Sequence, residues 1–385
     1  MSDPDDTPFI PYGRQWISEE DVDAVTSVLR SDWITTGPKI EEFESAVASR
    51  CGAKHAISVN NGTTALHTAY SALGVGPGDE VILPSMTFAS TANMAVLCGA
   101  RPVFADVDEE TLLVDPESVK ELLSERTKLV VGVDFAGQPF DHLAIREITE
   151  DRGIPMASDA AHSLGGSYRG EPVGSLADVT TFSFHPVKPI TTGEGGMVVT
   201  DIDNVASKCR IFRNHGIDTT FRQRESKSTF EYDVCSLGSN YRLTDIQCAL
   251  GITQLNRLDE WVSMRNRIAD LYDEHLSSLD GIKPLGRREE ALNAFHLYVV
   301  RVDRDAFGKG RSEVFNYLRE CGIGANVHYR PVHTFSYYQR EFGTEIGSCP
   351  RAEHAYDEIL SLPIFPKMDD EDVLRVVETL GECGD

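Results

Sequence analysis

The sequence predicts an α/β fold: a large domain with a mostly parallel, seven-stranded sheet between helices, followed by a smaller C-terminal α+β domain. Over the first 200 residues, short β-rich runs alternate with amphipathic helical stretches. This alternation is typical of a parallel sheet covered by helices. After residue 243 the pattern changes to two long helices and then to a mixed stretch. We therefore expect domains at residues 12–255 and 256–385.

The expected strands are short runs of β-branched and aliphatic residues, at 55–59, 80–84, 102–107, 128–134, 155–159, 178–184 and 195–200. Amphipathic stretches between the first five predict helices at 63–73, 90–97, 116–124 and 141–152. The loop 185–194 between the last two strands is too short for a crossover helix, so we expect an antiparallel edge there. Apolar residues at three- and four-residue spacing predict longer helices at 243–258 and 262–279.

Composition and charge exclude several classes of protein. Hydrophobic residues make up 41% and charged residues 25% of the 385-residue chain, as in ordinary globular proteins. The 61 acidic and 36 basic residues give a net charge of −25. Because this charge repels nucleic acids and anionic lipids, we expect neither a nucleic-acid nor a membrane partner. The uncharged stretch 81–100 is long enough to span a membrane, but its proline, glycine and hydroxyl residues favour a strand, a loop and a helix.

The eight cysteines never approach a Cys-x-x-Cys spacing. We therefore expect no disulfide framework, no metal site and a reducing, cytoplasmic location. His328 and His333 do not form a zinc pair either, because residues five apart do not share one helix face and no cysteine is near them.

Polar and aromatic residues follow three of the expected strands, at the end where ligands bind in open α/β sheets. The run Asn60-Asn61-Gly62-Thr63-Thr64 opens a helix after the first strand, and it could seat a phosphate or serve only as a helix cap. Phe88 lies in the loop after the second strand, either as a flat face for a ligand or as a core residue. Asp159 ends the fifth strand, either as a carboxylate that attracts a cation or as the cap of the next turn.

A lysine in a stiffened loop is the fourth such feature. Lys188 lies between Pro186 and Pro189, which fix the backbone on either side. A lysine that attacks a carbonyl must be held and partly desolvated so that its pKa falls, whereas a surface lysine needs no such framing. Together the four features describe a ligand with a phosphate, an aldehyde, a ring nitrogen and a flat face, all of which pyridoxal 5′-phosphate (PLP) has. The sequence has neither a dinucleotide-binding glycine fingerprint nor a P-loop.

At these residues the chain resembles the PLP-dependent sugar-nucleotide aminotransferases of the DegT/StrS type, which have the fold-type I architecture. The resemblance runs from about residue 11 to the C-terminus. The matching segments are residues 33–38, 61–63 and 158–162, the Lys188 loop, and residues 237–245 and 326–333. The segments HPVKPITTGEGG, DFAGQP and VHYRPVH look most like the branch that aminates 4-keto-6-deoxy sugars, which includes UDP-4-amino-4,6-dideoxy-N-acetyl-β-L-altrosamine transaminase.

The resemblance implies a role for each matching residue. Lys188 would form the Schiff base with PLP, and Asp159 would hold the pyridinium nitrogen. Cofactor contacts would come from Gly62, Thr63, Thr64, Phe88, Asp159, His162, Ser183, Lys188 and Asn240. Substrate contacts would come from Thr36, His185, Arg242, His328 and Tyr329, with Arg242 or Arg330 meeting the carboxylate of the amino donor. Asn240 would reach the phosphate held by a second subunit, so the resemblance implies a homodimer with shared active sites.

The implied activity is transfer of an amino group from an amino acid, commonly glutamate, to a nucleotide-linked keto-sugar in amino-sugar and cell-surface glycan biosynthesis. Two other functions stay open. Some relatives are sugar dehydratases that have a histidine in place of the lysine, and Lys188 argues against this function. A non-catalytic sugar-binding or regulatory relative would not need Lys188 and Asp159 together.

Overall fold

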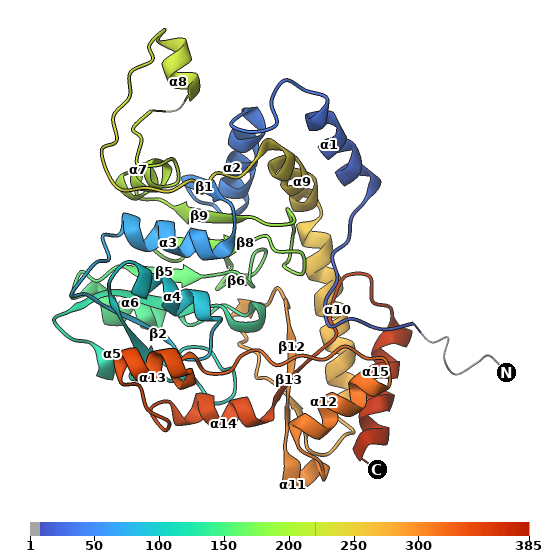
Figure 1. Cartoon of the computed structure of the whole chain (residues 1–385). Helices are drawn as coiled ribbons and strands as arrows, with labels where there is room; N and C mark the ends of the chain where they lie inside the picture. The colour runs from blue at the N-terminus through green and yellow to red at the C-terminus, as the bar shows by residue number, and fades with distance from the viewer. Residues whose placement is uncertain (1–7, 220, 385) are drawn as a thin grey trace.

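A seven-stranded sheet forms the centre of the computed structural model, which describes residues 8–219 and 221–384 (Figure 1). The strand order is β1-β9-β8-β5-β4-β2-β3. The bounds are β1 (His55–Val59), β2 (Glu80–Pro84), β3 (Arg101–Ala105), β4 (Thr127–Val133), β5 (Met156–Asp159), β8 (Val179–Ser183) and β9 (Gly196–Thr200). The predicted α/β fold class is confirmed, and each expected strand is present close to its expected bounds.

Strand β9 runs against the direction of its neighbours. It pairs antiparallel with β8 and also with β1, whereas the remaining pairs of this sheet are parallel. The predicted antiparallel pairing of the last two strands is therefore confirmed. The prediction that this pair forms the edge of the sheet is wrong. The edge strand is β1, which pairs with the side of β9 that faces away from β8. A short loop shows that the two strands it joins are paired, but it does not show which strand pairs on the other side.

Helices flank the sheet. Four of them lie at the expected places: α3 (Gly62–Ala72), α4 (Ala89–Leu97), α5 (Pro116–Leu122) and α6 (His142–Glu150). A fifth, α7 (Asp203–Phe212), was not predicted from the sequence. α3 begins with a capping box, in which the side chain of Asn61 accepts from the N–H of Thr64 and the Thr64 hydroxyl accepts from the N–H of Asn61. The run Asn60–Thr64 is therefore a helix cap, whatever else it binds.

Two helices that the sequence analysis did not assign precede the sheet. These are α1 (Glu19–Leu29) and α2 (Pro38–Arg50), and both pack on α9 (Asp245–Asn256). The buried carboxylate of Asp245 accepts from the N–H groups of Gly37 and Lys39 at 2.7 and 2.9 Å, so it caps the first turn of α2.

Between α7 and α9 the chain forms the short α8 (Phe221–Ser226), which projects away from the sheet (Figure 1).

The C-terminal part has a separate antiparallel sheet, ordered β10-β12-β13. Its elements are α10 (Leu258–Leu276), β10 (Ile282–Pro284), β12 (Tyr298–Val302), α11 (Arg304–Phe307), α12 (Arg311–Glu320), α13 (Ser336–Phe342), α14 (Pro350–Glu358), β13 (Ile359–Leu362) and α15 (Asp370–Gly384). A small third sheet joins β6 (Ser167–Tyr168), β7 (Glu171–Pro172) and β11 (Ala291–Leu292). α10 contributes Trp261 to the core beside the large sheet and Tyr272 to the C-terminal core. The division at residues 255 and 256 stays a prediction.

Residues 81–100 form β2, a loop and α4, as predicted, and not one long helix. Within the described ranges, no helix combines the length and the apolar character that crossing a membrane requires.

The carboxyl ends of the parallel strands bring the predicted site residues to one edge of the large sheet. Asp159 is the last residue of β5 and Ser183 the last residue of β8, and α3 starts directly after β1. The loop between β8 and β9 carries Lys188 along the same edge.

Candidate active site

A cavity of about 420 Å³ opens at this edge of the sheet. Of the residues predicted to form the site, it is lined by Gly62, Thr63, Phe88, Asp159, His162, Ser183, His185, Lys188, His328 and Tyr329. The last two come from the chain segment between α12 and α13, and the others come from the large sheet and its loops. The fold therefore gathers residues from both halves of the sequence around one space.

The partly buried Lys188 and the buried Asp159 line the same cavity. Burial lowers the pKa of Lys188 to about 7, although the negative charge of Asp159 acts in the opposite direction. Burial raises the pKa of Asp159, opposed by hydrogen bonds from the Thr91 hydroxyl at 2.7 Å and from the N–H of Ala161 at 3.4 Å. A lysine that loses its proton near neutral pH can attack an aldehyde, and a buried carboxylate attracts a cationic group.

One end of the cavity is the N-terminus of α3. The first N–H groups of a helix have no acceptor within the helix, and Gly62 and Thr63 line the cavity at this point. Ser183 lies so close that a Cβ on Gly62 would come within 2.8 Å of the Cβ of Ser183. Helix N–H groups next to a hydroxyl suit an anion such as phosphate.

Aromatic side chains form another wall. The ring of Phe88 is 58% exposed and lies 5.8 Å from the ring of Tyr329. The hydroxyl of Tyr329 is bonded to Nε2 of His162 at 3.2 Å. Burial, together with the positive charge of Lys188 in its ammonium form, holds the pKa of His162 well below its usual value. Nδ1 of His162 has no hydrogen-bond partner in the part of the chain that the structure describes, so this nitrogen is free to bond a ligand.

His328 is a fixed, neutral imidazole at the cavity. Its Nδ1 is bonded to the Ser361 hydroxyl at 2.8 Å and its Nε2 to the Asn326 side-chain amide at 3.3 Å. Burial and the positive charge of Lys188 lower the pKa of His328 to about 4. At neutral pH this side chain therefore borders the cavity as an uncharged group.

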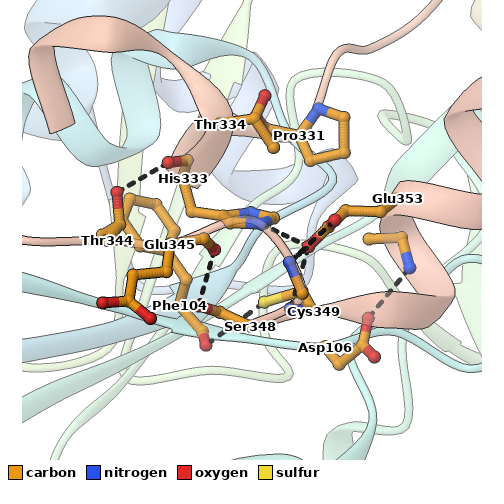
Figure 2. Close-up of polar contacts among 12 residues, drawn as sticks. Phe104, Asp106, Pro331, His333, Thr334, Thr344, Glu345, Ser348, Cys349 and Glu353 are labelled. Carbon is orange, nitrogen blue, oxygen red and sulfur yellow. Dashed lines mark hydrogen bonds and ion pairs between the residues drawn. The ribbon is translucent and has the colours of Figure 1, made fainter. Parts of the chain in front are cut away.

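Polar contacts anchor the chain that follows Tyr329 (Figure 2). Nε2 of the fully buried His333 is bonded to Oε1 of Glu353 at 2.8 Å, and the same carboxylate accepts from the N–H of Cys349. Asp106, which follows β3, accepts from the N–H of Ala352 at 3.0 Å. These bonds hold the chain after Tyr329 against the large sheet. We therefore assign His333 a structural role.

Thr64, Thr36, Arg242 and Asn240 lie outside this cavity. The Thr64 hydroxyl donates to Oδ1 of Asn60 at 2.6 Å and completes the helix cap. Thr36 and Arg242 line a second cavity of about 370 Å³, where Arg242 donates to Oδ1 of Asn214 at 3.0 Å. Asn240 is exposed. Their predicted contacts with cofactor or substrate stay predictions.

Sequence reasoning missed His296. Nε2 of this buried histidine lies 3.3 Å from Nζ of Lys188. His296 precedes β12 in a run without a motif, so no local signal identifies it. Tyr12 was also missed; it lines the cavity, and its ring lies 5.5 Å from the ring of His328.

The cavity residues fit PLP. The helix N–H groups and the hydroxyl of Ser183 match its phosphate, and the carboxylate of Asp159 matches its ring nitrogen. Lys188 matches its aldehyde. The free Nδ1 of the buried His162 supplies one more polar contact.

Comparisons with known proteins agree with this reading. The family model of the DegT/DnrJ/EryC1/StrS aminotransferase family matches residues 15–381. The spore coat polysaccharide biosynthesis protein SpsC of Bacillus subtilis (strain 168) is 41% identical over 374 residues, which are 97% of this chain and 96% of the relative. The UDP-4-amino-4-deoxy-L-arabinose–oxoglutarate aminotransferase of Shewanella sediminis (strain HAW-EB3) is 40% identical over 380 residues, which are 97% of this chain and 98% of the relative.

A solved structure is also similar over almost the whole chain. The putative sugar aminotransferase Spr1654 from Streptococcus pneumoniae, in its PMP form, has a TM-score of 0.91 at 31% identity, covering 97% of this chain and 99% of that chain. Its PLP form has a TM-score of 0.90. The fold-type I architecture and the cofactor are therefore confirmed. The chain belongs to the DegT/DnrJ/EryC1/StrS aminotransferase family and is a PLP-dependent sugar aminotransferase.

Proposed function

We propose that this enzyme transfers the amino group of L-glutamate to the 4-keto group of a nucleotide-linked 4-keto-6-deoxy hexose, for amino-sugar and cell-surface glycan biosynthesis. The proposal is carried by one observation, that Lys188 and Asp159 line the same cavity. The name of the Shewanella relative supports the position and the donor, because it pairs a UDP-linked 4-amino sugar with oxoglutarate.

In this proposal each residue of the cavity has one task. Bound PLP supplies an aldehyde that carries the amino group and a ring that takes up electrons. Lys188 anchors the aldehyde, and its free amine then accepts and returns a proton at Nζ, which its pKa of about 7 favours. The carboxylate of Asp159 stabilises positive charge on the ring nitrogen. The N–H groups of Gly62 and Thr63 and the hydroxyl of Ser183 hold the phosphate.

The remaining wall residues orient the ring and the sugar. Phe88 would cover a face of the bound ring, and His162 would bond the ring oxygen through Nδ1, the nitrogen that its bond to Tyr329 leaves free. His185, His328 and Tyr329 border the space for the sugar. Because His328 is neutral, it can meet a sugar hydroxyl without placing a charge there.

Arg242 is the better candidate for the donor's carboxylate. Nε and Nη2 of Arg330 both donate to Thr334, at 2.9 and 2.8 Å. These two N–H groups therefore already have acceptors within the same chain segment. Arg242 faces the neutral side chain of Asn214 in the second cavity, near the positive charge of Arg213. Among the described residues Arg242 forms no ion pair, because Glu41 and Glu44 in the same cavity pair with Arg222 and Arg213. Such a guanidinium attracts a carboxylate.

We further propose a homodimer in which Asn240 and Arg242 serve the partner's cavity. Asn240 is exposed and does not line the cavity of its own chain. The chain just before it exposes four large apolar side chains: Phe230 88%, Tyr232 58%, Val234 58% and Leu237 88%. Such a patch needs a covering surface, and a second copy related by a two-fold axis would supply one.

The test is a panel of keto-sugar nucleotides, incubated with the PLP-loaded enzyme and L-glutamate and analysed by mass spectrometry. We expect amino product only from 4-keto-6-deoxy sugars, with equimolar oxoglutarate, and none with Lys188→Ala protein. Amination of a 3-keto sugar alone would contradict the proposed position. Loss of water without consumption of glutamate would indicate a dehydratase, and tight sugar binding without turnover would indicate a binding protein.

A further inference from the structure

Three buried histidines lie around the amine of Lys188, and their bonding differs. His162 uses Nε2 for Tyr329, and His328 uses both ring nitrogens for Ser361 and Asn326. Nε2 of His296 lies 3.3 Å from Nζ of Lys188. Among the residues that the structure describes, His296 is thus the histidine bonded to the lysine.

The backbone around His296 is held from two sides. The N–H of Ala294 donates to the carbonyl oxygen of Gly137 at 3.0 Å, and a Cβ on Gly137 would come within 2.9 Å of the backbone nitrogen of His296. On the other side, the buried guanidinium of Arg265 donates to the carbonyl oxygen of Phe295 at 3.1 Å. The imidazole therefore projects from a fixed backbone, as a group that positions another one must.

The surroundings keep this imidazole uncharged. Burial, together with the positive charges of Arg265 and of Lys188 in its ammonium form, holds the pKa of His296 well below its usual value. The groups that act on Lys188 itself are burial and the negative charge of Asp159, and they leave its pKa at about 7. Near neutral pH both the ammonium and the amine forms of Lys188 exist, and both carry N–H groups that a neutral imidazole nitrogen can accept.

We propose that His296 is a positioning residue for Lys188: its Nε2 accepts an N–H from Nζ whenever the amine is free. This places the imidazole proton on Nδ1, which has no hydrogen-bond partner among the described residues. An amine that donates to His296 has its lone pair directed elsewhere, toward the cavity, where a proton can be received. In the opposite tautomer, Nε2 of His296 would carry the proton and donate it to the lone pair of Nζ. That lone pair could then not receive a proton from the substrate. The inference rests on the proposed role of Lys188 in proton transfer.

The test compares His296→Gln with His296→Phe. The amide oxygen of glutamine can take the place of Nε2, whereas phenylalanine keeps a ring of similar size without an acceptor. We expect His296→Phe to lower kcat by roughly tenfold to a hundredfold, with the KM for both substrates within about twofold, since only proton transfer is impaired. We expect His296→Gln to recover most of that loss. If His296→Phe does not fold, His296→Leu takes its place.

A second readout uses the full chain prepared without PLP. Competitive labelling with acetic anhydride over a range of pH, followed by mass spectrometry of the Lys188 peptide, measures the pKa of this amine. We expect the pKa to fall in His296→Phe, because the ammonium form loses its acceptor, and to stay near the wild-type value in His296→Gln. Wild-type kcat and labelling in His296→Phe would overturn the inference. Equal impairment of both variants would also overturn it, because the acceptor would then be irrelevant.

Borohydride reduction of the wild-type holoenzyme separates this inference from the proposed function. A label on a lysine other than Lys188 removes the proposed function. A label on Lys188, together with an unimpaired His296→Phe variant, removes only the role of His296.

Discussion

The hydroxyl of Thr91 donates a hydrogen bond to Oδ2 of Asp159 at 2.7 Å, and the hydroxyl of Thr87 lies 2.8 Å behind it. Thr91 lies in α4 and Asp159 at the end of β5, so the contact joins two elements of the large domain. Burial raises the pKa of Asp159, and this bond opposes the rise. The two threonines therefore help to keep the buried carboxylate charged.

Replacing Thr91 by valine should lower turnover about tenfold at pH 7, because a hydrogen bond to a charged group is worth about 1.5–3 kcal/mol. The pKa of Asp159 should rise, so the acidic limb of the pH–rate profile should move to higher pH. The profile of kcat/KM against pH measures this shift. Thr91→Ser, which keeps the hydroxyl, is the matched control and should behave like the wild type. An unchanged acidic limb in Thr91→Val would contradict the role of the bond.

Asp159→Asn should cost at least about a hundredfold in turnover, because the ring nitrogen of PLP loses its counter-charge in a shielded site. The measurement is kcat at saturating substrates, with bound PLP quantified in parallel so that loss of cofactor is not mistaken for loss of catalysis. Wild-type turnover with full cofactor content would mean that Asp159 does not serve the ring nitrogen.

Lys188→Ala should abolish transamination while the protein keeps its oligomeric state and still binds PLP without a covalent bond. The lysine lies in a loop and contributes little to the core. Borohydride reduction of the wild type followed by peptide mapping should place the label on Lys188, and the variant should take up no label. A labelled peptide from any other part of the chain would show that the site has been misidentified.

The pair formed by the fully buried His333 and the partly buried Glu353 leads to a prediction about stability (Figure 2). His333→Ala should lower the free energy of unfolding by about 2–3 kcal/mol at pH 7, since it removes a fully buried ring and leaves a carboxylate without its partner. Urea denaturation measures this loss. A loss under about 0.5 kcal/mol, as at an ordinary surface site, would show that the pair does not anchor the segment.

The same pair should show its pH dependence in acid. Burial opposes the shift, but hydrogen bonds from His333 and from the N–H groups of Gly347 and Cys349 lower the pKa of Glu353 overall. A carboxyl whose pKa is lower in the folded state stabilises fully above its unfolded pKa of about 4.3, and it loses this contribution as pH falls through the folded value. The difference in stability between the wild type and Glu353→Gln should therefore shrink below that pH. A constant difference would contradict the lowered pKa.

Lys188 and Asp159 could be located from the sequence because each lies at the end of a short, recognisable strand or in a loop with distinctive neighbours. His296 could not be located, since it reaches Lys188 only when the chain before β12 packs on Gly137. The position of β9 inside the sheet depends in the same way on pairing with β1, which lies far away in the sequence. Local sequence patterns thus predict helices, strands and the reactive residues at their ends. Contacts between distant segments can be seen only in the folded chain.

The last prediction concerns Asn240, which is exposed and lies outside the cavity of its own chain. In the proposed dimer, each active site combines Lys188 of one chain with Asn240 of the other. Asn240→Asp places a carboxylate against the phosphate of PLP, and like-charge repulsion should weaken cofactor binding and inactivate the enzyme. Lys188→Ala should be inactive as well.

Mixing these two inactive variants under conditions of subunit exchange should restore activity. Half of the dimers become mixed, and in each mixed dimer both defects fall into one site while the other site is intact. Activity should therefore recover to about a quarter of the wild-type value, the statistical limit for a two-fold dimer. If Asn240 served its own chain, both sites of every mixed dimer would stay defective. The measurement is the specific activity after exchange, with exchange itself verified by native mass spectrometry of tagged subunits. Absence of recovery in a sample that has exchanged would remove Asn240 from the partner's site.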